Sequence, residues 1–147
     1  MTHPLRILIA DDNEDAAEAL CALLDLSGHE CRAARNGQEA VELAREWSPD
    51  AAILDLAMPV MNGFEAAEAI RRDTDVAVLM ALSGWGGQDV ELGAKNAGFD
   101  LVMCKGDPFE ELERALRHAI EDRSTLPVGY AEAHRPPGAL AGPAATV

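Results

Sequence analysis

The stretch Ala51-Ala52-Ile53-Leu54-Asp55 is a short apolar run that ends on an acidic residue, and the expected architecture follows from it. Three further apolar runs also end on polar residues. Runs of this length that alternate with helical patterns predict parallel strands, whose carboxyl ends meet at one edge of a sheet. Open α/β sheets bind their ligands at that edge. The other runs span 5–10, 76–82 and 99–104, and they end at Asp11 and Asp12, at Ser83 and at Lys105.

Helical periodicity between these runs completes a pattern in which strand and helix alternate five times. Glu39 follows Asn36 by three residues, which predicts a capping box at the second helix. Asp107 is expected to cap the last helix, with Pro108 at its first position. The expected helices span 16–27, 36–47, 62–72, 87–97 and 108–120, with a weaker strand over 29–35.

The length and composition predict one globular domain followed by a tail. A chain of 147 residues, of which 48% are hydrophobic, can bury a core without metal or disulfide support. The alternating pattern covers 4–123, whereas 124–147 are rich in Pro, Ala and Gly and lack apolar periodicity. We therefore expect a domain over 4–123 and a disordered tail over 124–147.

The charge and the cysteines bear on partners and location. A formal net charge of −14 argues against nucleic acid or an anionic membrane as a direct partner. The sequence shows neither a signal peptide nor a run of about 18 apolar residues, so a cytoplasmic location is expected. The oligomeric state is open, with a monomer as the default. Cys21, Cys31 and Cys104 show no pairing or metal spacing, which predicts reduced thiols.

Three carboxylates are expected to converge at the sheet edge. Asp11 and Asp12 taken alone could simply cap a helix, but Asp55 closes a buried strand, where an isolated charge is costly. Carboxylates packed together repel one another unless a cation is present, and Mg²⁺ prefers such oxygen ligands. Two of the acids can hold the ion while the third acts as a nucleophile.

A cation and a hydroxyl complete this set. Lys105 is one of only two lysines, against ten arginines, and it follows a predicted strand. Phosphoryl transfer requires neutralisation of charge on the equatorial oxygens, which an ammonium, a divalent ion and a Ser83 hydroxyl can supply. Ser83 alone would be a turn residue before Gly84.

In order and spacing, these residues resemble the CheY-like receiver domains of bacterial two-component response regulators. The resemblance covers about 5–122 and includes the stretch after the third strand, Asp55-Leu56-Ala57-Met58-Pro59-Val60-Met61-Asn62-Gly63. It implies a flavodoxin-like, doubly wound, five-stranded parallel sheet of order 2-1-3-4-5, with a receiver domain over 4–123.

The resemblance also implies roles for individual residues. Asp55 would be the phosphoacceptor, taking phosphate from a histidine of a sensor kinase or a histidine phosphotransfer protein to form an aspartyl phosphate. Ser83 would be the switch hydroxyl, and Lys105 would bind the phosphoryl group. Such a domain is a switch toward a downstream protein target, and it helps to catalyse its own phosphorylation and dephosphorylation. Mg²⁺ would be held by Asp11, Asp12, Asp55 and the backbone carbonyl of Ala57.

Four positions depart from the pattern or modulate it. Gly106 stands where the family has a cis proline, so a trans bond or a rebuilt loop is expected. Val102 stands where many members have a switch Tyr or Phe, so output is expected through the glycine-rich fourth helix. Ala57 and Trp85 flank the expected path of the hydrolytic water, and neither orients water well, which predicts slow autodephosphorylation.

Three functions remain open from the sequence. A stand-alone phosphorylation switch agrees best with the intact set of acids, hydroxyl and lysine. A degenerate receiver that binds partners without phosphorylation is the alternative, which Gly106 and Val102 favour. A Mg²⁺-dependent phosphohydrolase ranks third because Asp55-Leu56-Ala57 lacks the second acid of the usual Asp-x-Asp motif.

Overall fold

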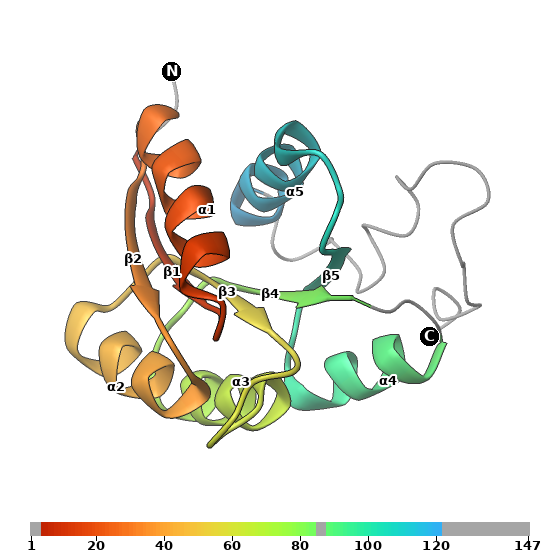
Figure 1. Ribbon diagram of the computed structural model, residues 1–147. Helices are drawn as coiled ribbons and strands as arrows, with labels where there is room; N and C mark the ends of the chain where they lie inside the picture. Colours follow the sequence, from red (N-terminus) through yellow and green to blue (C-terminus); the bar gives the residue numbers. More distant parts are fainter. Residues whose placement is uncertain (1–3, 85–87, 122–147) are drawn as a thin grey trace.

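The computed structural model describes residues 4–84 and 88–121, and these form a five-stranded parallel sheet flanked by helices (Figure 1). The strand order is β2-β1-β3-β4-β5, which confirms the predicted doubly wound α/β fold. The strands are β1 (Arg6–Ala10), β2 (Glu30–Ala34), β3 (Ala51–Asp55), β4 (Val78–Ser83) and β5 (Leu101–Cys104). The helices are α1 (Glu14–Leu26), α2 (Gly37–Trp47), α3 (Gly63–Asp73), α4 (Gln88–Ala97) and α5 (Phe109–Glu121).

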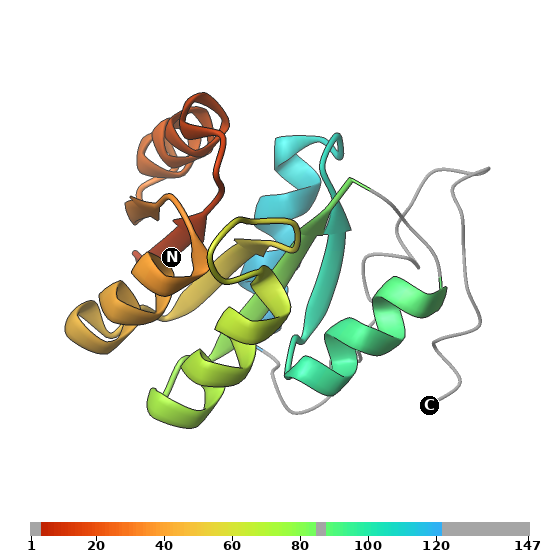
Figure 2. The same ribbon diagram turned by 60° about the horizontal axis from the view of Figure 1, so that its bottom comes forward.

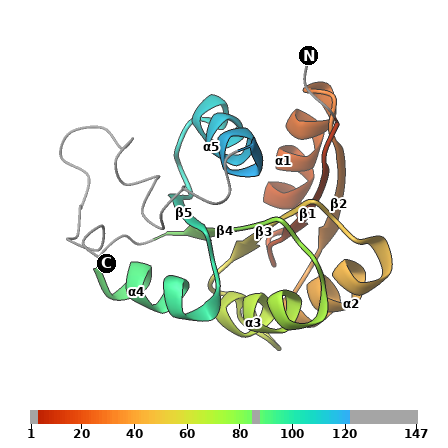
Figure 3. The ribbon, with the colours of Figure 1, turned by 180° about the vertical axis from the view of Figure 1, so that it is seen from behind.

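Helices cover both faces of the sheet, so the core has two layers. α1 and α5 pack on one face, while α2, α3 and α4 lie side by side on the other (Figures 2 and 3). Side chains alternate between the faces: Ile7 and Ile53 point toward α1 and α5, and Leu8 and Leu54 point toward α2 and α3. β3 is buried at every position because it lies in the middle of the sheet.

The edge strand β2 is the one whose sequence pattern was weak. Four of its five residues are exposed or half-buried, and only Ala34 is buried. An edge strand of this kind carries few apolar residues because solvent reaches one of its sides. β2 is held by parallel pairing with β1, in which Arg6 lies opposite Glu30.

Helix capping follows the sequence in part. The Asn36 side chain accepts a hydrogen bond from the Glu39 amide at 2.9 Å, but the Glu39 carboxylate turns to the amide of Arg35, so the predicted box is only half formed. A complete capping box joins Asn62 and Glu65 at the start of α3.

The prediction for the start of α5 is wrong in detail. The Asp107 carboxylate accepts from the Cys104 amide at 3.0 Å and so closes the turn after β5. The first helical hydrogen bond runs from Leu112 to the Pro108 carbonyl, which makes Pro108 the residue before the helix. The tight turn after β5 draws the carboxylate backward, and the helix begins one residue later than expected.

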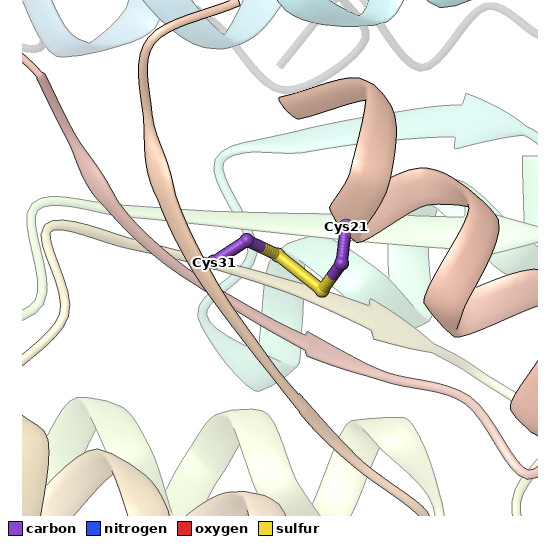
Figure 4. The surroundings of a disulfide bond; sticks show 2 residues. All are labelled: Cys21 and Cys31. Atoms are coloured by element: carbon purple, nitrogen blue, oxygen red, sulfur yellow. A yellow bond between two sulfur atoms is a disulfide. The ribbon is translucent and has the colours of Figure 1, made fainter. Parts of the chain in front are cut away.

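The prediction of reduced cysteines is wrong for one pair. Cys21 on α1 and Cys31 on β2 form a disulfide, with their Cα atoms 5.4 Å apart (Figure 4). Spacing along the chain does not reveal the pair, because the two residues meet only when α1 packs back against β2. Cys104 at the end of β5 is not part of a disulfide and is half-buried. Among the described residues, no helix combines the length and the apolar character needed to cross a membrane.

Candidate functional site

The predicted site residues come together at the carboxyl edge of the sheet. Asp11 directly follows β1, Asp55 ends β3, Ser83 ends β4 and Lys105 directly follows β5. The amide of Lys105 donates to the carbonyl of Ser83 at 2.9 Å, which holds the ends of β4 and β5 together. Ser83 itself is buried. The parallel topology therefore brings into one place residues that are far apart in the sequence.

Three carboxylates form a compact acidic cluster. Asp11, Asp12 and Asp55 each offer an oxygen, and these oxygens lie within 4.8 Å of one another. Asp11 and Asp55 are buried, whereas Asp12 faces solvent. Hard oxygen donors in this arrangement suit a divalent cation such as Mg²⁺, which keeps several water ligands on its open side.

Backbone amides orient the two buried carboxylates. Asp11 Oδ1 accepts from the Asn13 amide at 2.9 Å, and Asp55 Oδ1 accepts from the Ala57 amide at 3.0 Å. Both bonds span two residues, so each acid is held by the loop that follows its own strand. The second oxygen of each carboxylate, Oδ2, lies near the Lys105 side chain.

Lys105 places a positive charge against those second oxygens. Its Nζ lies 2.8 Å from Asp55 Oδ2 and 3.6 Å from Asp11 Oδ2. Burial alone would lower the pKa of Lys105, but the hydrogen bond and negative charge of Asp55, with that of Asp11, raise it above its usual value. The ammonium is therefore firmly protonated.

The pKa of Asp11 is raised as well, which disfavours its ionised form. Burial and the nearby charge of Asp55 raise the pKa of Asp11, although the Asn13 amide and Lys105 partly offset this rise. A carboxylate that is costly to ionise in place is one that gains when a cation binds. The electrostatics thus favour cation binding at this edge.

The structure also locates the positions that depart from the family pattern. Val102 is 1% exposed in the apolar layer beneath α2, α3 and α4. Gly106 and Ala57 are exposed at the mouth of the cluster, and the bond from Lys105 to Gly106 is trans, as expected. Trp85 lies outside the described residues.

Two glycines beside the site were not singled out from the sequence as site residues. Gly37 and Gly63 begin α2 and α3, and both approach the loop that follows Asp55. The available signal was the Asn-Gly pair, which occurs at Asn36-Gly37 and again at Asn62-Gly63. In each pair the asparagine caps a helix and the glycine leaves space for a neighbouring backbone.

Comparison with known proteins agrees with this geometry. The family model of the response regulator receiver domain matches residues 7–117. The DNA-binding response regulator MtrA of Mycolicibacterium smegmatis is 32% identical over 131 residues, which cover 86% of this chain and 58% of that protein. The response regulator receiver protein Anae109_2439 of Anaeromyxobacter sp. is 39% identical over 100 residues, which cover 68% of this chain and 42% of that protein. The chain spans about half the length of these curated relatives.

Solved structures show the same fold. The chemotaxis protein CheY4 of Vibrio cholerae superposes with a TM-score of 0.74 at 25% identity, covering 79% of this chain and 98% of that one. The signal receiver domain of the response regulator NarL from Mycobacterium tuberculosis gives a TM-score of 0.75 at 25% identity, covering 83% and 100% of the two chains. With strand order, acidic cluster and family match in agreement, the chain belongs to the response regulator receiver domain family.

Proposed function

We propose that this protein is a phosphorylation switch in which Asp55 accepts a phosphoryl group from a phosphohistidine. Receiver domains are phosphoacceptors that interact with histidine kinases. The observation that carries the proposal here is the setting of Asp55: a buried carboxylate with one oxygen on the Ala57 amide and the other on the Lys105 ammonium. An Asp55 oxygen attacks phosphorus, the N–P bond of the donor breaks, and the released imidazole takes up a proton.

Mg²⁺ is the proposed cofactor, and the donor set fits it. Receiver domains bind this ion at an acidic pocket, and the cluster of Asp11, Asp12 and Asp55 supplies the hard oxygens that it prefers. We assign the Ala57 carbonyl as a fourth ligand because the loop after Asp55 places Ala57 beside that carboxylate. When bound, the ion supplies positive charge that offsets the negative charge of the transferring phosphoryl group.

The phosphorylated state would be read through Lys105 and Ser83. The new oxygens on Asp55 attract the ammonium, and the Ser83 hydroxyl donates to them as the switch hydroxyl of this mechanism. Both residues sit at the ends of strands that lead into α4 and α5, so movement at the site reaches that face. We propose this face as the contact for a downstream protein.

The partners and location follow from the same proposal. A sensor histidine kinase or a histidine phosphotransfer protein supplies the phosphoryl group, which places the switch in the cytoplasm. MtrA is a DNA-binding response regulator, but the net charge of −14 of the present chain does not favour nucleic acid as a direct partner. We further propose that this receiver domain acts without an attached output domain. The intact mass of the protein isolated from its native source tests this.

Slow loss of the phosphoryl group is also proposed. Ala57 is exposed at the mouth of the cluster, and its methyl group cannot orient an attacking water. Trp85, outside the described residues, offers only an indole N–H donor. The lifetime of the adduct in Trp85→Glu, which adds an acceptor, should be shorter than in the wild type.

The test of the phosphoacceptor is intact-mass spectrometry after incubation with acetyl phosphate. Wild type with Mg²⁺ should gain one phosphoryl adduct, and the adduct should be absent with EDTA and in Asp55→Asn. Asp75→Asn, a matched change at an exposed residue in the loop before β4, should be phosphorylated like the wild type. If the wild type gains no adduct from acetyl phosphate or from its kinase, the degenerate receiver, which the buried Val102 favours, replaces this function.

A further inference from the structure

The turn between β2 and α2 contacts both of the loops that hold the acidic cluster. This turn, residues 34–37, lies next to the loop that carries Asp11 and Asp12 and next to the loop that follows Asp55. The Asp11 amide donates to the Ala34 carbonyl at 3.1 Å, and the Gly37 amide donates to the Met61 carbonyl at 3.0 Å. Two backbone hydrogen bonds from one short turn therefore fix the acidic loops relative to each other.

Gly37 packs against the loop that follows Asp55 and leaves no room there for a side chain. A Cβ atom at this position would collide with the Met61 carbonyl oxygen and lie 2.8 Å from its carbon and 2.9 Å from the Met61 Cβ. Backbone atoms cannot yield as the end of a flexible side chain can. Gly37 is not in the left-handed region, so the requirement is for space rather than for an unusual backbone angle.

The loop against which Gly37 packs is short and tightly constrained. Its far end is closed by the Gly63 amide, which donates to the Leu56 carbonyl at 3.2 Å. At Val60 the backbone adopts φ 68°, which is costly for a β-branched residue, and the Met61 amide donates to the Pro59 carbonyl at 2.7 Å. A strained turn persists only where its surroundings hold it, and the contact with Gly37 is one such restraint.

Resting on the proposed function, we infer that Gly37 is a positioning residue for the cation site. It touches neither carboxylate, but it sets the place of the loop that supplies Ala57 and orients Asp55. A side chain at position 37 would push Met61 away, and the displacement would reach Ala57, four residues earlier in the same closed loop. The Asp11 and Asp55 loops would then lose the relative placement that cation binding requires.

Gly37→Ala tests the inference through the affinity for Mg²⁺ in the unphosphorylated protein. Mg²⁺ is titrated while amide resonances of Asn13 and Ala57 are followed by NMR, which also shows whether the fold is intact. Disturbing groups that orient metal ligands typically weakens binding, so we expect the dissociation constant to rise by about tenfold. Phosphorylation by acetyl phosphate should slow at limiting Mg²⁺ and recover at saturating Mg²⁺.

Two controls separate positioning from stability. Leu24→Ala removes a buried side chain near the far end of α1 and should lower the urea midpoint of unfolding while leaving the Mg²⁺ dissociation constant unchanged. Gly84→Ala is the chemically matched change at an exposed glycine where a Cβ meets nothing within 4 Å. It should leave Mg²⁺ binding unchanged.

Each outcome decides between the claims. A Gly37→Ala protein that binds Mg²⁺ like the wild type overturns the inference while the proposed function stands. A wild type that forms no adduct overturns the proposed function itself. If Gly37→Ala does not fold, the coupling is tested in the wild type, where Mg²⁺ should slow hydrogen exchange of the Gly37 amide, which donates to the Met61 carbonyl. Unchanged exchange of that amide also overturns the inference.

Discussion

The Lys105 ammonium lies 2.8 Å from Asp55 Oδ2, in an ion pair whose two members differ sharply in burial. The Asp55 side chain is 3% exposed and the Lys105 side chain 40% exposed. The carboxylate is therefore fixed in the protein interior, while the lysine can shift at the surface to follow a new negative charge. This asymmetry suits a site in which the carboxylate is modified and the lysine ammonium moves in response.

Replacing Lys105 with methionine should slow phosphorylation and strengthen Mg²⁺ binding. The loss of one charge-assisted hydrogen bond of about 1.5–3 kcal/mol predicts phosphorylation by acetyl phosphate that is slower by roughly 10- to 100-fold. Affinity for Mg²⁺ should rise, because the ammonium no longer repels the ion. Lys95, the other lysine of the chain, lies on α4, and Lys95→Met should alter neither the phosphorylation rate nor the affinity for Mg²⁺. Equal rates for Lys105→Met and the wild type would remove Lys105 from the mechanism.

Output through α4 predicts a change in amide exchange on phosphorylation. Gly93 brings α4 close to α3, since a Cβ there would lie 3.2 Å from the Phe64 ring. Glycine within a helix also weakens it by about 1 kcal/mol relative to alanine. Hydrogen exchange over 88–97 should therefore change between the free and phosphorylated protein, and exchange over α2 should not. Unchanged exchange in α4 would place the output elsewhere.

Apolar periodicity alone could predict the alternation of strands and helices, whereas the strand order was expected only from the family resemblance. β3 and β4 are buried on both faces and read as unbroken apolar runs, whereas the half-exposed β2 gave only a weak pattern. The cluster of Asp11, Asp55 and Lys105 was predictable because parallel strands share one carboxyl edge.

Features that depend on packing between elements could not be predicted in this way. The pairing of Cys21 with Cys31 requires the position of α1 over β2, which no local pattern contains. The contact of Gly37 with Met61 joins α2 to a loop after β3, so the Asn-Gly pair read only as a turn and a cap. Asp107 had several possible backbone partners, and only the geometry of its turn selects Cys104.

Val102→Tyr should not restore an aromatic switch. Val102 is 1% exposed among tightly packed side chains, and overpacking a core of this kind typically costs about 1–3 kcal/mol. Urea unfolding should show that loss for Val102→Tyr and a smaller one for Val102→Ile. A tyrosine variant as stable as the wild type would reveal space for a ring beside β5, contrary to this packing.

Reduction of the disulfide should lower stability without unfolding the protein. The bond joins residues ten positions apart, and closing a loop of that length contributes about 2–3 kcal/mol. Urea unfolding with and without a phosphine reductant measures the difference. The double variant Cys21→Ser/Cys31→Ser should be insensitive to the reductant. Thiol titration of the unreduced, denatured protein should find one titratable thiol, from Cys104, and a count of three would contradict the pairing.

The carboxylate of Glu113, in the middle of α5, should make stability depend on pH. His29 Nδ1 accepts from the Leu5 amide at 3.2 Å, so its proton lies on Nε2, which donates to Glu113 at 3.1 Å. Arg117 donates to the same carboxylate at 2.9 Å. Burial alone would raise the pKa of Glu113, but the hydrogen bonds from Arg117 and His29 lower it below its ordinary value of 4.5.

The folded protein holds the Glu113 proton less tightly than the unfolded chain does. The hydrogen bonds of Glu113 with His29 and Arg117 therefore stabilise the fold at pH values above the unfolded pKa near 4.5. That contribution disappears as the pH falls through the lower pKa of the folded state. Glu113→Gln should therefore be less stable than the wild type at neutral pH, by about 0.5–1 kcal/mol, with the gap closing in acid. Glu18→Gln, an exposed change on α1, should show no such gap. The contrary result is a difference in stability between Glu113→Gln and the wild type that stays constant from neutral pH to below the folded pKa. That result would mean that the charge of Glu113 contributes nothing to stability.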